Sequence, residues 1–184
     1  MSTPALNALL EEAADTLRQL ATFVATLPAA QYTAPHGADA RHSIGKHVRH
    51  ILDHYEALLA GRYDAQAFTI DYEHRRRDPD LERHPDVALE HLGHLRERVT
   101  RLGQRDTATH RLQLAYRAGD HVLPLNTSVE RELAFLTSHA IHHMAIIALL
   151  ADTQGIEVVE TFGVHPSTQR HWQKSRPSHH EVTS

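Results

Sequence analysis

Apolar residues recur at helical spacing in four long segments, which are separated by polar stretches containing proline or glycine. The first segment begins at Thr3 and Pro4, which suit an N-cap and a first helical turn, and ends at Pro28. The other three segments comprise residues 43–61, 85–102 and 127–152. The pattern therefore predicts four helices, and helices joined by both short and long connections predict a helix bundle.

The fourth segment is apolar on most of its circumference, which is typical of a helix buried at the centre of a bundle. Thr127 and Glu130 have the spacing of a capping box, so this helix is predicted to begin there. Its apolar positions are Leu133, Ala134, Leu136, Ile141, Met144, Ile147, Leu149 and Leu150. We expect the rest of the chain to pack around this helix.

The connecting segments predict little regular structure. Residues 29–42 contain Pro35 and Gly37, and residues 62–85 are too polar and too broken by Pro79 for a packed element. The only strand-like pattern runs from residue 112 to 116, before a turn at residues 118–120, which predicts a short hairpin.

The segment after Gly155 keeps apolar residues for packing along the outside of the bundle, namely Val158, Val159, Phe162 and Trp172. Residues 175–184 are polar and are expected to be disordered. We therefore predict an all-α four-helix bundle in one domain, residues 1–174, with long loops and one short β-hairpin.

Composition excludes several classes of function. The 184 residues include 19 Lys and Arg against 23 Asp and Glu, a net charge of −4, so no basic surface favours nucleic acid. Cysteine is absent, which excludes disulfides, thiolate metal sites and cysteine nucleophiles. The first 20 residues carry acidic side chains where a signal peptide needs a positive start. We expect a cytoplasmic protein in which no segment is long enough to span a bilayer, and a homodimer is an open alternative.

The chain contains 18 histidines, and three of them lie in the most apolar segment. His139 and His143 are four residues apart, so their side chains project from one helix face on successive turns. One shared metal ion satisfies two buried imidazoles while both stay neutral. A core histidine bonded to a neighbour is the alternative for either residue alone. Imidazole ligands predict that the metal affinity falls between about pH 7 and pH 5.

The helix predicted at residues 43–61 carries three further histidines, His47, His50 and His54. Its apolar face comprises Ile44, Val48, Ile51, Leu52, Tyr55, Leu58 and Leu59. His47 and His54 border this face, whereas His50 lies further round towards the polar side. Periodicity alone therefore favours His47 as a partner of the metal pair. A solvated helix edge is the alternative for each of the three.

Residues beside the histidines exclude some known metal chemistries. Di-iron bundles place a Glu three residues before the ligand His, whereas Leu136 and Ala140 stand at those positions. Zinc proteases place a Glu directly after the first His of the pair, where this chain again has Ala140. Haem needs only one or two axial ligands, so clustered histidines favour a bare ion.

The segments SIGKHVRHILDHY and SHAIHHMAIIALL resemble the DinB/YfiT-like metalloenzyme family of bacterial four-helix bundles. In that family the second helix contributes one metal-binding histidine and the fourth helix contributes two. The resemblance covers residues 43–150 and implies His50, His139 and His143 as ligands of a divalent ion. We follow it for the second helix and keep His47, which periodicity favours, as the reserve. Many members have Arg-Gly-Gln after the last histidine, whereas this chain has Met-Ala-Ile, so no role of that Gln carries over.

Three imidazoles leave coordination positions for water or substrate, as in catalytic zinc sites, and they suit zinc and nickel equally. We expect a metal-dependent transferase or hydrolase in which Asp53, Tyr72, Arg75 and His142 assist from beside the ligands. Tyr72 and Arg75 lie in a loop long enough to cover the mouth of the bundle. Family relatives include thiol-dependent transferases, so a small thiol is the first expected substrate. The alternatives are a non-catalytic metal-binding or stress-response protein and a bundle that merely tolerates its histidines.

Overall fold

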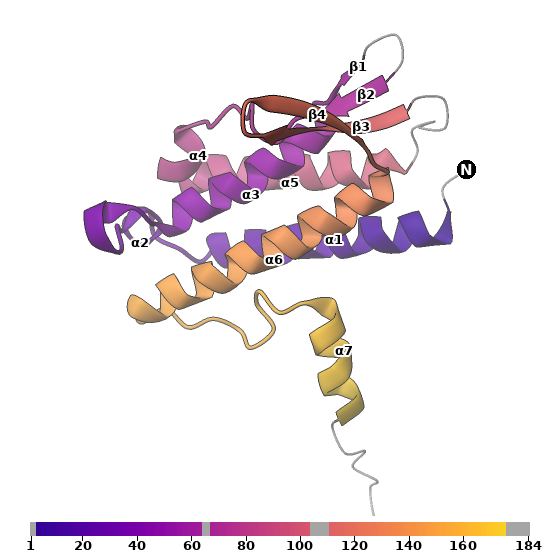
Figure 1. Ribbon diagram of the computed structural model, residues 1–184. Helices are drawn as coiled ribbons and strands as arrows, with labels where there is room; N and C mark the ends of the chain where they lie inside the picture. The colour runs from indigo at the N-terminus through magenta and orange to yellow at the C-terminus, as the bar shows by residue number, and fades with distance from the viewer. Residues whose placement is uncertain (1–2, 64–66, 104–110, 176–184) are drawn as a thin grey trace, which may run out of the picture.

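Four long helices form the body of the protein (Figure 1), and the computed structural model describes residues 3–63, 67–103 and 111–175. These helices are α1 (Pro4–Val24), α3 (Ile44–Leu59), α5 (Pro85–Leu102) and α6 (Val129–Thr153). Helices α1 and α3 each pack against both α5 and α6, so the four form a ring around one core. The predicted all-α four-helix bundle is confirmed.

The core consists of aliphatic side chains from all four helices. Its fully buried members include Leu17, Leu20, Ile51, Leu52, Leu92, Leu95, Leu133 and Leu136. Burying a side chain of this size contributes about 1.5–3 kcal/mol, so these residues stabilise the frame that holds every other feature in place.

Two of the four long helices begin at side-chain caps that the sequence predicts. The hydroxyl of Thr3 accepts a hydrogen bond from the Leu6 amide, and that of Ser43 accepts one from the Lys46 amide. The predicted capping box of α6 is wrong, because the cap is Ser128 rather than Thr127. The Thr127 hydroxyl instead donates to a carboxylate within the helix. Local spacing does not reveal this longer contact.

Helix α6 is less buried than its composition predicts, since Leu149 is 68% exposed and Ala134 and Ala145 also face solvent. By length and composition alone, α6 is apolar enough to cross a membrane. The sequence interpretation that no segment meets this test is therefore wrong. A core helix of a bundle passes the same test, and here α6 packs between α1 and α3.

The segments predicted as loops contain short packed elements. Residues 29–42 include the short helix α2 (Ala29–Thr33) and a 3₁₀ turn at Ala38–Ala40. Residues 62–85 form β1 (Arg62–Tyr63), β2 (Ala67–Ile70) and α4 (Asp80–Arg83). The prediction of no packed element there is wrong, because the few apolar side chains in the segment are buried, namely Ala67, Ile70 and Leu81.

Helix α4 lies close against the start of α3, and glycine makes this approach possible. A Cβ added at Gly45 would stand 2.2 Å from the carbonyl oxygen of Glu82 and 2.7 Å from the ring of Tyr32. The Tyr32 hydroxyl donates to the carbonyl of Leu81 at 2.6 Å. Helix α4 is thereby held against both α3 and α2.

The predicted hairpin exists, as β3 (Arg111–Ala118) and β4 (His121–Asn126), and turns at Gly119. It belongs to a larger sheet than expected, with strand order β1-β2-β3-β4. Strands β2 and β3 run parallel, with Ile70 opposite Leu114. The sheet lies beside the ends of α3 and α5 and the start of α6 (Figure 1).

The chain after α6 returns along α1. Phe162 is buried against Phe23, with ring centroids 4.7 Å apart, as the sequence predicts. The Gln19 side chain donates to the Thr161 carbonyl and accepts from the Gly163 amide, both at 3.2 Å. A Cβ at Gly163 would stand 2.7 Å from the Ala145 amide nitrogen, so this strap, residues 156–164, lies directly on α6.

The last described helix, α7 (Pro166–Ser175), has no buried residue. Val159 is 67% exposed, so the prediction that it packs on the bundle is wrong, whereas Trp172 is 37% exposed and is partly covered. Ser175 ends α7 rather than beginning a disordered tail, and residues 176–184 of the predicted tail lie outside the described residues.

Candidate metal centre

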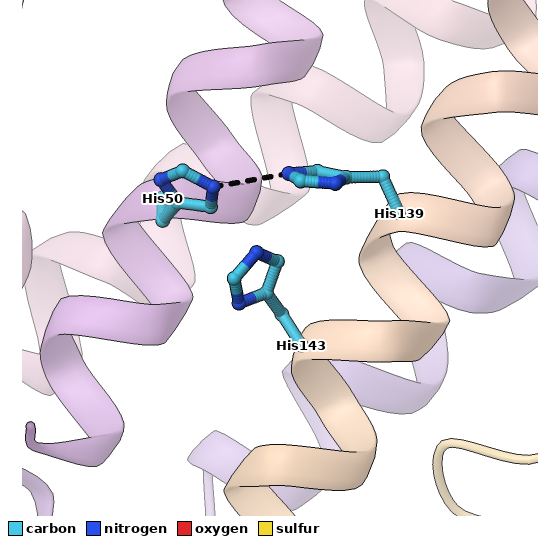
Figure 2. Close-up of side chains that lie close together, drawn as sticks. All are labelled: His50, His139 and His143. Carbon is cyan, nitrogen blue, oxygen red and sulfur yellow. Dashed lines mark hydrogen bonds between the residues drawn. The ribbon is translucent and has the colours of Figure 1, made fainter.

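Three histidines from α3 and α6 come together in the half-buried space between the two helices (Figure 2). One ring nitrogen from each of His50, His139 and His143 lies within 4.8 Å of the other two. The His50 and His139 Nε2 atoms are 3.0 Å apart. Among the described residues no carboxylate joins this group.

The local fold explains why these side chains meet. His139 and His143 stand on successive turns of one face of α6, as their spacing predicts. His50 reaches them from α3, the helix packed beside α6. Apolar periodicity identifies the aliphatic face of a helix. It did not select His50, because α3 contacts α6 at this level through polar imidazoles.

The three residues fit a shared cation. Tetrahedral zinc with nitrogens at about 2.0–2.1 Å requires ligand nitrogens about 3.3 Å apart. The 3.0 Å pair and the 4.8 Å limit of the group bracket that separation. Facing lone pairs on neutral imidazoles need either a proton or a metal between them, and a cation satisfies all three rings at once.

The electrostatics of the site keep the imidazoles neutral. Burial, followed by the charges of neighbouring histidines, lowers the pKa of His50 to about 2 and that of His143 to about 3. Burial also lowers the pKa of His139. The three imidazoles are therefore neutral near pH 7, which is the form that can bind a metal, and the loss of metal affinity expected between pH 7 and pH 5 stays a prediction.

A comparison with protein families decides which group the chain belongs to. The family model described as the DinB family matches residues 1–173. The chain belongs to the DinB family. Comparisons with curated proteins and with solved structures give no match. The predicted resemblance is therefore confirmed, and the three-histidine group of this DinB bundle is compatible with metal binding.

His47, the reserve ligand, contacts His143 instead of joining the group of three histidines. Its Nδ1 is 3.0 Å from Nδ1 of His143, and it is outside the group of three nitrogens. His54, one turn beyond His50, donates from Nδ1 to the His50 carbonyl at 2.8 Å. Nη1 of Arg75 lies 2.7 Å from Nδ1 of His54 and 2.9 Å from its Nε2. Both nitrogens of His54 are therefore occupied within the DinB bundle.

Among the residues predicted to assist the ligands, Arg75 comes closest to the histidines. Its Nη1 is 3.4 Å from Nδ1 of His50 as well as adjacent to His54. Its Nε is buried without a hydrogen-bond partner among the described residues. Asp53 is buried on α3 and binds Arg49 at 3.1 Å, and burial raises the pKa of the Asp53 carboxyl.

Tyr72 and His142 are placed differently from the expectation. The Tyr72 hydroxyl donates to Glu132 at 2.7 Å, so it is directed to the start of α6. The Tyr72 ring stacks on His54 with centroids 5.6 Å apart. His142 is exposed, and its ring lies edge-on to that of His143, with centroids 5.2 Å apart. Tyr72 therefore braces the loop, and His142 faces solvent.

Sequence reasoning missed Glu132, whose side chain is 0% exposed. The carboxylate accepts hydrogen bonds from Tyr72, Thr127 and Arg131. Phe135, one turn later, stacks on His139 at 5.6 Å and contacts Tyr72 at 5.5 Å. Glu132 stands between Arg131 and Leu133 in the first turn of α6, where an acidic residue is favoured by the helix dipole, so the sequence carried no signal for its burial.

Proposed function

We propose that this DinB protein is a metal-dependent enzyme whose divalent ion is held by His50, His139 and His143. The observation that carries the proposal is the convergence of three imidazole nitrogens without a carboxylate from the described residues. Three protein ligands leave an open coordination position, which distinguishes catalytic from structural zinc sites. Zinc and nickel both suit an all-imidazole set.

The reaction that these surroundings favour is a transfer to or from a small thiol. A bound divalent ion supplies Lewis-acid chemistry and lowers the pKa of a group that binds it. Arg75 supports an anionic substrate, because its Nε has no partner among the described residues and it lies beside His50 and His54. The nearby carboxylate of Asp53 is already bound to Arg49. A guanidinium in this position suits a carboxylate carried by the thiol.

A non-catalytic metal-binding or stress-response protein is the second candidate. One observation favours it: the Tyr72 hydroxyl is bound to Glu132, and both nitrogens of His54 are occupied. Tyr72 and His54 are therefore already paired, and neither presents a free acid or base for proton transfer. In this case the ion is bound without turnover.

The test uses protein prepared without a histidine tag and loaded with cobalt. Adding cysteine or a larger carboxylate-bearing thiol is expected to produce a sulfur-to-cobalt charge-transfer band. Arg75→Ala should weaken the thiol titration while cobalt affinity is unchanged, and Arg76→Ala, an exposed neighbour, is the matched control. Full metallation with no spectral change for any thiol contradicts the thiol reaction and leaves the second candidate.

A further inference from the structure

We propose that His47 is a positioning residue that sets the tautomer of His143 and so directs its Nε2 towards the metal. This proposal rests on the metal site proposed above. Nδ1 of His47 and Nδ1 of His143 are 3.0 Å apart, and the ring centroids are 5.2 Å apart. Figure 2 shows the other ring nitrogen of His143 directed into the space between His50 and His139.

The hydrogen bond between the two rings can run in either direction, and only one direction permits metal binding. A neutral imidazole carries one proton, so one ring nitrogen donates and the other accepts. If His143 donates from Nδ1 to His47, its Nε2 keeps the lone pair that binds a metal. If His47 donates instead, Nε2 of His143 carries the proton and cannot bind. The ion therefore requires His47 to act as the acceptor.

The surroundings of His47 hold the ring in place without fixing the direction of this bond. His47 is 8% exposed, and its ring lies nearly parallel to that of His42, 5.5 Å away. Its Nε2 is buried and has no hydrogen-bond partner among the described residues. Because no second bond favours either tautomer of His47, the occupant of the metal site decides between them.

His54 differs from His47 although both flank His50 on α3. The His50 carbonyl lies 2.8 Å from Nδ1 of His54, and Nη1 of Arg75 lies within 2.9 Å of both ring nitrogens, so the partners of this ring all belong to the protein. The partner of the His47 ring is instead His143, which is itself a candidate metal ligand. This arrangement explains why the apolar periodicity of α3 favoured His47 as a ligand. The ring is buried beside the site and contacts the ligand candidate His143 rather than the ion.

The first test measures zinc affinity by chelator competition in His47→Leu and His47→Asn. The Asn amide can place an acceptor near the position of Nδ1, whereas Leu fills the space without one and removes a buried polar group. We expect Leu to weaken zinc binding about 10- to 100-fold, the usual effect of removing a partner of a metal ligand, and Asn to restore most of it. His42→Leu, which removes only the stacked ring, is the matched control and should retain the affinity.

The cobalt spectrum separates a positioning role from ligation. With the same three ligands, both His47 variants should keep the wild-type ligand-field bands once they are saturated. An equal loss of zinc affinity in His47→Leu and His47→Asn, together with shifted cobalt bands, would mean that His47 is itself a ligand. Wild-type zinc affinity in His47→Leu would show that His47 does not position His143. His139→Ala tests the metal site itself: if that variant keeps its affinity, the proposed function fails rather than the role of His47.

Nitrogen-15 NMR of the imidazoles provides a readout that needs no turnover. On addition of zinc, His143 should show a protonated Nδ1 and a metal-bound Nε2, and His47 should show a protonated Nε2. In metal-free His47→Leu the preference of His143 between its tautomers should change, whereas in His42→Leu it should not. Zinc bound through Nδ1 of His143 overturns the proposal.

Discussion

The two faces of α6 form contacts of different kinds with its neighbours. Against α3 it presents His139 and His143, which meet His50 and His47; we call this the histidine seam. Against α1 it packs through apolar side chains, and we call the core between α1 and α6 the apolar seam. At the outer edge of this seam, Ile141, Phe23 and Phe162 line an open groove of about 640 Å³ that polar residues also line. His139 and Ile141 are two residues apart, about 200° around the helix.

The comparison shows how one helix can serve stability and chemistry without conflict. Aliphatic burial on the α1 side contributes free energy of folding whether or not an ion is present. Histidines on the α3 side contribute little unless a cation joins them, because partly buried imidazoles lose hydration. Substitutions in the two seams should therefore separate into effects on metal affinity and effects on stability.

The largest expected effect is loss of the ion from the histidine seam. His50→Ala, His139→Ala and His143→Ala should each abolish stoichiometric zinc binding, with affinity reduced on the order of a thousandfold. Competition with a chromogenic chelator measures this loss. His94→Ala, on the exposed side of α5, is the control and should bind normally. Tight binding by His143→Ala would remove the proposed site.

The next effect belongs to the apolar seam. Leu20 is fully buried on α1, and Leu20→Ala should lower the free energy of unfolding by about 2–5 kcal/mol through lost burial and a residual cavity. Urea denaturation of metal-free protein measures this change. Zinc affinity of the folded variant should stay at the wild-type value; a parallel loss of affinity would show that the two seams are coupled.

Glu132 joins the loop to α6 near the histidine seam, and its replacement should have a moderate effect. Glu132→Gln substitutes one of the two acceptor oxygens, so one partner among Tyr72, Thr127 and Arg131 is left unpaired, at a cost of about 1–3 kcal/mol. Hydrogen exchange at residues 71–75 should also accelerate. Glu97→Gln on the exposed face of α5 is the control. Unchanged exchange would mean that Tyr72 does not hold the loop.

A smaller effect is the acid sensitivity of metal-free protein. Burial and neighbouring charges lower the pKa of His47 to about 4 and that of His143 to about 3, below the 6.5 of the unfolded chain. The unfolded state therefore binds more protons in this range, and the free energy of unfolding decreases as the pH falls from about 6.5 towards 4. Urea midpoints across this range measure the slope. His143→Gln should flatten it, whereas an unchanged slope would contradict the lowered pKa.

The smallest effect is expected at His142. Its ring is exposed beside His143, so His142→Ala should change zinc affinity and the free energy of unfolding by less than about 0.5 kcal/mol. Chelator competition and urea denaturation measure both quantities. A clear loss of zinc affinity in His142→Ala would show that His142 assists the metal ligands.

Local spacing predicted much of the fold and of the site. The i and i+4 positions of His139 and His143, the caps at Thr3 and Ser43, and the helical periodicity all depend on neighbours within one helix. His50 came from the resemblance, because its approach to α6 depends on how two helices pack.

Features that join distant segments could not be predicted from spacing. The Tyr72–Glu132 hydrogen bond spans 60 residues, and β2 pairs with β3 across the whole of α5. Two strands of two and four residues carry too few alternations to be recognised in a sequence. The contact between the His47 and His143 rings also joins two distant helices, so spacing within α3 could not predict it.

The strap has a consequence for the order in which the chain can mature during synthesis. Gln19 in the first helix is bound by Thr161 and Gly163, more than 140 residues later. These partners leave the ribosome only after more than 140 further residues have been made, so α1 cannot complete its packing before then. Contacts of such long sequence separation also slow closure of the fold. Helix α1 is thus made long before the segment that secures it.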